Sequence, residues 1–180
     1  MKKTIHKFFG VWAFEKEEQW LNEMAQKGLH LCDVGFCRYT FEAGAPGAYV
    51  YRMELLDNWL SHEKSVQYIQ FLEDTGAEKV GSLTRWVYFR KKAGDHGFDL
   101  FSDVRSRIRH LDRILWMTAL PLWLNLFNTI NCASNWWMSG LWGNRVIILL
   151  CATVTLLLGY GFFRLLGMRN RLKKELRLHE

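Results

Sequence analysis

The most strongly apolar stretch of the 180-residue chain is uncharged from Val146 to Phe163, with the sequence VIILLCATVTLLLGYGFF. Leu165 and Leu166 continue the apolar run after a single arginine. An α-helix needs about 20 apolar residues to cross the hydrocarbon core of a bilayer, whereas a buried helix of a water-soluble protein is usually shorter. We therefore expect a membrane-spanning helix over residues 146–166.

A second and less purely apolar run, ILWMTALPLWLNLFNTI, begins at Ile114. Pro121 should kink a helix there. Asn125 and Asn128 are three positions apart and so share a helix face, and their amides need hydrogen-bond partners in hydrocarbon, which we expect on the second helix. The run predicts a first membrane helix over residues 114–133. Its marginal length leaves an interfacial or re-entrant segment as the alternative.

Basic residues flank both apolar runs. Residues 101–113 hold four arginines, and the tail at residues 167–180 holds five basic residues. The loop between the runs, residues 134–145, holds one basic residue and three tryptophans. Positive charge stays on the cytoplasmic side, and tryptophan favours the headgroup layer. We therefore expect a two-helix transmembrane hairpin, a multi-pass protein of the cell membrane with both termini cytoplasmic and a short external loop.

The charge of the chain is divided unevenly. Residues 1–100 hold 13 Lys and Arg against 14 Asp and Glu, whereas residues 101–180 hold 11 against 4. The formal net charge of +6 is therefore a property of the membrane half, where it orients the helices, and it does not indicate nucleic-acid binding. The apolar part of the opening MKKTIHKFFG is too short for a secretory signal, so we expect residues 1–100 to form a cytoplasmic domain.

Strand-like and helix-like segments alternate within residues 1–100. Helical periodicity covers Phe14–Lys27, and a second helix, capped by Ser61, buries Val66, Ile69 and Leu72. The strand-like segments are residues 4–9, 29–41, 49–55, 77–82 and 85–91. The Gly and Pro content of AGAPG, residues 43–47, predicts a hairpin between the second and third strands.

An internal echo relates the two halves of this domain. One constant shift along the sequence aligns four pairs: Trp20 with Tyr68, Leu21 with Ile69, Met24 with Leu72, and Gly28 with Gly76. The predicted order β-α-β, hairpin, β-α-β is the ferredoxin-like pattern, an α+β fold in which an antiparallel sheet carries two helices. Chance similarity between two amphipathic helices is the alternative.

Two sequence elements carry a family resemblance. They are E-x-x-W-L-x-x-M-x-x-x-G, residues 17–28, and Y-x-F-E-x-G-x-P-G-x-Y-x-Y, residues 39–51. Over about residues 5–105 the chain resembles the bacterial family catalogued as domain of unknown function 2812. The resemblance implies a membrane-associated protein with a cytoplasmic domain, often encoded beside a PadR-type regulator, which makes such a regulator or a transporter a candidate partner. It implies no activity and no catalytic residues.

The acidic first helix is the first candidate for chemistry. It carries Glu15, Glu17, Glu18 and Glu23, but no His or Asp completes a recognisable motif, so we expect a solvated helix face. The other candidates are a nucleophile and base formed by Cys32 and His30, a zinc site using Cys32 and Cys37, and an RNA-binding surface of Tyr49, Tyr51, Trp86, Tyr88 and Phe89. None has the third group, ligand spacing or basic charge that it requires.

We therefore assign no catalytic, cofactor-binding or metal-binding residue and expect no nucleic-acid partner. The small basic patch of Arg90, Lys91 and Lys92 should face the membrane or a partner. The expected function is that of a membrane-anchored, non-enzymatic regulatory or adaptor protein whose cytoplasmic domain binds a protein partner. A small-molecule sensor that signals through the hairpin and an uncharacterised membrane enzyme are the alternatives. Self-association of the chain is left open.

Overall fold

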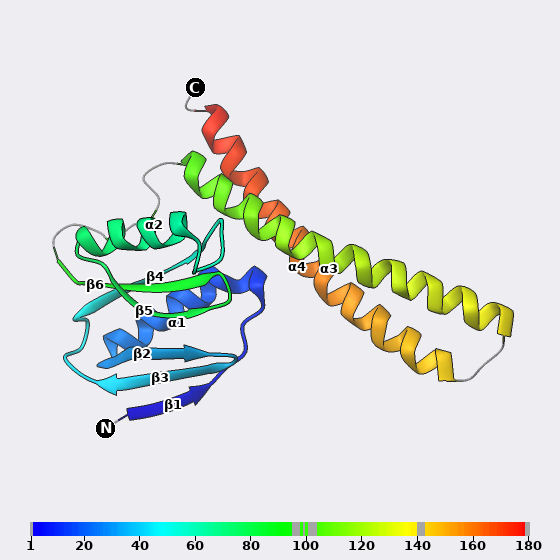
Figure 1. Ribbon diagram of the computed structural model, residues 1–180, viewed down its shortest axis with the longest axis horizontal. Coiled ribbons are helices and arrows are strands. Elements are labelled where there is room, and N and C mark those ends of the chain that lie inside the picture. Colours follow the sequence, from blue (N-terminus) through cyan, green and yellow to red (C-terminus); the bar gives the residue numbers. More distant parts are fainter. Residues whose placement is uncertain (1, 95–97, 99, 101–103, 140–142, 179–180) are drawn as a thin grey trace. The chain divides into compact units, whose positions relative to one another are not determined.

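The computed structural model describes residues 2–94, 98, 100, 104–139 and 143–178 (Figure 1). The chain divides into two compact units, Met1–Asp103 and Val104–Glu180. We call them the N-terminal unit and the helical unit, and each is described by itself.

The N-terminal unit alternates strands with helices. In chain order its elements are β1 (Lys2–His6), a 3-10 helix η1 (Val11–Ala13), α1 (Phe14–Gln26), β2 (Leu29–Gly35), β3 (Arg38–Ala43), β4 (Tyr49–Leu55), α2 (Glu63–Asp74), β5 (Glu78–Leu83) and β6 (Trp86–Lys92). The α+β class and the approximate positions of these helices and strands agree with the sequence patterns.

The strands form two antiparallel sheets, which we call the first sheet, ordered β1-β3-β2, and the second sheet, ordered β4-β6-β5. Each sheet is built by one β-α-β-β unit, so the internal echo of the sequence is a structural repeat. The register of β2 shifts around Cys32 and that of β5 around Val80, which are equivalent positions of the echo. Gly28 and Gly76, the echoed residues after α1 and α2, both have positive φ, where glycine avoids the strain that a Cβ causes.

The single ferredoxin-like sheet that we predicted is replaced by these two sheets. AGAPG does not form a hairpin, because it leads from β3 in the first sheet to β4 in the second. The true hairpins join β2 to β3 through Phe36 and Cys37, and β5 to β6 through Thr84 and Arg85. These tight loops contain no glycine, and Cys37 and Thr84 adopt positive φ instead. Because hairpin loops are usually recognised by their glycine or asparagine residues, the sequence did not indicate these two.

In the N-terminal unit the two sheets meet where β2 lies beside β5, because a Cβ on Gly81 of β5 would lie 3.3 Å from the backbone nitrogen of Val34 on β2 (Figure 1). The Trp20 ring of α1 lies against the rings of Tyr39 and Phe41 on β3, with centroid distances of 5.0 and 5.7 Å. Phe14, at the start of α1, meets Trp86 of β6 at 5.8 Å. Helix α1 therefore covers one face of each sheet, with Trp20 against the first sheet and Phe14 against the second.

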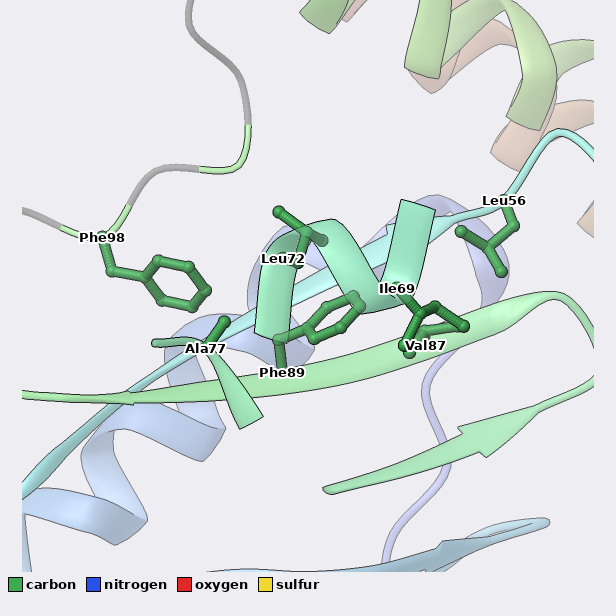
Figure 2. Close-up of a cluster of buried hydrophobic side chains, with 7 residues drawn as sticks. All are labelled: Leu56, Ile69, Leu72, Ala77, Val87, Phe89 and Phe98. Carbon is green, nitrogen blue, oxygen red and sulfur yellow. The ribbon is translucent and has the colours of Figure 1, made fainter. Parts of the chain in front are cut away.

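Helix α2 covers the other face of the second sheet. Figure 2 shows Ile69 and Leu72 of α2 gathered with Val87 and Phe89 of β6, and Leu56, Ala77 and Phe98 complete this buried cluster. The predicted inner stripe is wrong at one position, because Val66 is 53% exposed and Ser65 is buried in its place. The N-cap is His62, directly after the predicted Ser61, and its ring nitrogen accepts from the backbone N–H of Lys64.

The helical unit consists of α3 (Val104–Ser139) and α4 (Gly143–Leu178), which run side by side (Figure 1). Each has 36 residues and is about 54 Å long at 1.5 Å per residue. Helix α3 contains Pro121 and extends well into the predicted external loop, of which residues 140–142 lie outside the described part of the chain. One helix of the described residues, Arg145–Leu178, is long and apolar enough to cross a membrane.

Candidate functional site

A buried carboxylate joins the two sheets inside the N-terminal unit. The hydroxyl groups of Tyr39, on β3, and Tyr88, on β6, donate to the same Glu17 oxygen at 2.6 and 2.7 Å. All three side chains are buried, and Glu17 is only 7% exposed. Glu17 stands on α1, whose first turn therefore carries a polar link to each sheet. We call these three residues the Glu17 cluster.

Burial changes the acid–base behaviour of the Glu17 cluster. It raises the pKa of Glu17, and the hydrogen bonds from the two tyrosines oppose that shift only in part. The pKa values of Tyr39 and Tyr88 are raised as well, by burial and by the nearby carboxylate. Such perturbation is found at active sites and also in structural networks. Because the cluster is enclosed between α1 and the two sheets, we interpret it as structural.

The next residues of α1 cover an open sheet edge. The Glu18 carboxylate accepts from the backbone N–H of Met53 at 3.0 Å. The Asn22 side chain accepts from the N–H of Tyr51 at 2.8 Å and donates to the Tyr51 carbonyl at 3.1 Å. These groups belong to β4, the outer strand of the second sheet. Helix α1 therefore supplies the hydrogen bonds that a neighbouring strand would otherwise make.

The acidic helix thus differs from the solvated face that we predicted. Glu15 and Glu23 are exposed as expected, but Glu17 is buried and Glu18 is half-buried beside Arg52, 3.3 Å away. The tyrosines that surround Glu17 lie 22 and 71 residues away in the sequence. No local pattern in α1 signals those distant partners.

The aromatic residues considered for RNA binding do not form an open surface. Four of them, Tyr51, Trp86, Tyr88 and Phe89, are buried in the core. Tyr49 is half-buried, and its ring lies under the Arg90 guanidinium at 4.5 Å. Since stacking on bases requires exposed rings, these five side chains offer no platform for RNA.

His30 and Cys32 are not paired for nucleophilic chemistry. The buried His30 ring makes its hydrogen bond to the Ala45 carbonyl at 2.9 Å, whereas the Cys32 thiol donates to the Thr40 carbonyl at 3.3 Å. Each side chain thus has a backbone partner of its own. Among the described residues, no group of three or more His, Cys, Asp or Glu side chains could hold a metal ion.

The predicted basic patch of Arg90, Lys91 and Lys92 is divided in the structure. Arg90 forms an ion pair with Glu78 at 2.7 Å and lies 3.9 Å from Glu42 of the first sheet. The Lys91 ammonium lies 5.9 Å from the centre of the Phe98 ring, and Lys92 is exposed. Arg90 therefore helps to join the sheets, which removes it from the surface that we had expected to face a partner.

The two long helices are joined by polar contacts in their apolar parts. The Asn125 amide of α3 donates to the Cys151 carbonyl and to the Thr155 hydroxyl of α4, both at 2.8 Å. The Asn128 amide reaches the Cys151 sulfur at 3.3 Å. Both asparagines thus find their partners on the second helix, as we predicted. Near the start of α3 and the end of α4, Asp112 and Arg169 form an ion pair at 2.5 Å.

The outer surfaces of both helices are apolar. Only 6% of the most apolar part of α4 is buried. Large exposed side chains of α4 include Leu149, Leu150, Leu156, Leu157 and Phe163. Helix α3 exposes Trp116, Leu120, Trp123, Leu124 and Phe127. Continuous apolar surface of this extent is rare on water-soluble monomers and is typical of membrane or partner surfaces.

Comparison with curated proteins finds no match, and comparison with solved structures finds none either. A protein-family model described as "Protein of unknown function (DUF2812)" matches residues 13–123. The match begins just before α1, covers α1 to β6 and ends inside α3 at Trp123, beyond the resemblance that ended near residue 105. The family's shared region therefore includes the start of the helical unit, and the chain belongs to the DUF2812 family.

Proposed function

We propose that this chain is a membrane-anchored, non-enzymatic regulatory or adaptor protein, in which α3 and α4 cross the cell membrane and the N-terminal unit binds a protein partner in the cytoplasm. The observation that carries the anchor is the exposed apolar surface of α4. In water that surface would cost about 25 cal/mol for each Å² left uncovered, whereas in lipid it costs nothing.

The basic residues support an orientation with both termini in the cytoplasm. Arg105, Arg107 and Arg109 lie in the first turns of α3, and Lys173 and Lys174 lie near the end of α4. The two helices run in opposite directions, so these residues gather at one end of the pair. Arginine and lysine next to a membrane helix remain on the cytoplasmic side.

The partner surface that we propose is the outer face of the first sheet. The second sheet is covered by α1 on one face and α2 on the other, but the first sheet has α1 on one face only (Figure 1). Its other face carries the polar side chains of Lys2, Thr4, Arg38, Thr40 and Glu42. A mixed polar face of this kind suits a partner that binds and leaves, since permanent interfaces are more apolar.

Two exposed aromatic side chains stand at one end of this face. Phe36 is 79% exposed at the tip of the β2–β3 hairpin, and Phe8 is 67% exposed after β1. They are neighbours, because the Lys7 N–H donates to the Cys37 carbonyl at 3.1 Å. Aromatic residues are common anchors of protein interfaces, so we assign Phe8 and Phe36 to the partner contact.

The test is a pull-down of the detergent-solubilised chain from its native cells, without added ligand. A protein that copurifies with the wild type should be lost from Phe36→Ser. It should be retained by Phe71→Ser, a matched control whose ring is 60% exposed on α2. Equal recovery with both variants would contradict the assigned surface. Recovery of no protein, together with a thermal shift on adding a metabolite pool, would favour a small-molecule sensor instead.

A further inference from the structure

The α3 helix has a row of side chains, three of them asparagines, that stays largely exposed beside its contact with α4. Its positions alternate in steps of four and three, which places them along one face: Met117, Pro121, Leu124, Asn128, Asn131 and Asn135. Except for the half-buried Met117, all are exposed. Three asparagines in one exposed row contrast with the apolar side chains that surround them. We call this row the asparagine seam.

The asparagine seam borders the face that packs on α4, and the amide nitrogen of its Asn128 also reaches the Cys151 sulfur of α4 at 3.3 Å. Asn125 and Thr129, which bond with Thr155, lie on the α4 side of α3. At 100° per residue, Asn131 lies about 120° or more around the helix from both of them. The seam therefore remains accessible after α3 and α4 have paired.

Two amides of the seam are incompletely bonded within one chain. The Asn131 amide nitrogen donates to the Phe127 carbonyl at 2.9 Å, but its side-chain oxygen meets no donor among the described residues. Among the residues that the structure describes, the Asn128 side-chain oxygen is approached only by the Cys132 thiol, at 4.0 Å. In hydrocarbon, an amide oxygen without a donor costs several kcal/mol.

We propose that the asparagine seam is the contact between two copies of this chain in the membrane. An amide both donates and accepts, so two copies related by a two-fold axis satisfy each other with the same residues. A lipid acyl chain provides neither a hydrogen-bond donor nor an acceptor. An unrelated partner helix would need matching amides at the same spacing, whereas a second copy of the chain has them because its sequence is identical. This inference rests on the proposed membrane insertion of α3.

Cysteine crosslinking in native membranes tests the geometry. In a chain whose four cysteines are replaced by alanine, Leu124→Cys lies in the seam, and Leu126→Cys lies on the opposite side at almost the same depth. Both positions are exposed. With a membrane-permeant oxidant, Leu124→Cys should form a disulfide-linked dimer and Leu126→Cys should not. Equal crosslinking at both positions, or at neither, would overturn the proposal.

A second measurement tests the amides themselves. Energy transfer between labelled full-length chains in liposomes, followed as lipid is added, gives the dissociation constant. The double variant Asn128→Leu with Asn131→Leu should raise that constant at least tenfold. Ser134→Leu, an exposed polar residue outside the seam whose hydroxyl bonds within α3, should leave it unchanged. An unchanged constant for the double variant would refute the role of the amides.

Alkaline carbonate extraction of the same membranes distinguishes a wrong seam from a wrong membrane assignment. If the chain resists extraction but does not crosslink, α3 and α4 are inserted and the seam proposal alone fails. If carbonate releases the chain, the membrane insertion under "Proposed function" fails and the seam proposal fails with it.

Discussion

Removal of one hydroxyl group from the Glu17 cluster should loosen both sheets of the N-terminal unit. In Tyr39→Phe the Glu17 oxygen loses its 2.6 Å donor and keeps the 2.7 Å donor from Tyr88. A neutral buried hydrogen bond contributes about 1 kcal/mol and one to a charged group about 1.5–3 kcal/mol. We therefore expect a loss of about 1–3 kcal/mol, because the shape of the side chain is otherwise kept.

Hydrogen exchange of the full-length chain in detergent measures this loss locally. Amides of β3 and β6 should exchange about 5- to 150-fold faster in Tyr39→Phe, since each 1.4 kcal/mol is a factor of ten. The matched control is Tyr49→Phe, whose half-buried ring makes its contacts through the ring face. The exchange rates of the control should stay at the wild-type values.

The double variant sharpens the test. Without Tyr39 and Tyr88 the Glu17 oxygen has neither hydroxyl donor, so Tyr39→Phe with Tyr88→Phe should cost more than the sum of the two single changes. Additive losses would show that the two hydroxyl groups do not share one acceptor. Exchange in Tyr39→Phe that matches Tyr49→Phe would refute the account of the Glu17 cluster.

Three further predictions concern other parts of the chain. Because burial raises the pKa of Glu17 above 4.5, protonated Glu17 contributes stability to the folded unit. That contribution should be fully present below about pH 4.5 and be lost as pH rises through the folded-state pKa, and thermal unfolding of Glu17→Gln should lack this loss. Gly28→Ala should lower the unfolding temperature more than Gly76→Ala. Both residues have positive φ, where an alanine costs about 1–2 kcal/mol, but only at Gly28 does the new Cβ lie 2.7 Å from a backbone oxygen. Equal losses in the two variants would contradict the close packing at Gly28. Asn125→Leu should weaken the pairing of α3 with α4 by about 0.6–2 kcal/mol in a detergent-unfolding titration. The control Thr153→Leu should not weaken it, because the Thr153 hydroxyl donates to a carbonyl within α4. No loss of stability in Asn125→Leu would mean that the Asn125 amide does not stabilise the helix pair.

The local features of the chain could be predicted from the sequence, because neighbouring residues determine them. The β4 strand has the bounds that its alternation predicted, and the glycines after α1 and α2 have the positive φ expected of a helix end. Asn125 has its partners on α4, as expected for an amide that lies in an otherwise apolar segment.

The pairing of the strands could not be predicted in this way. Trp86 lies opposite Leu55, although α2 and β5 separate the two residues in the sequence, and no local pattern encodes that pairing. The same holds for Glu17, which looks like a solvated glutamate until Tyr39 and Tyr88 are brought to it by two different sheets. The internal repeat was visible in the sequence, but a repeat does not say whether its halves share one sheet or form two.

Cysteine labelling in intact cells tests the proposed membrane topology most directly. Trp137 lies near the end of α3 with its side chain 85% exposed, at the proposed external surface. In a chain without other cysteines, Trp137→Cys should react with a membrane-impermeant maleimide added to intact cells. Phe36→Cys, in the proposed cytoplasmic unit, should react only after lysis. Labelling of Trp137→Cys that also requires lysis would contradict the account that α3 and α4 cross the membrane with their connection outside.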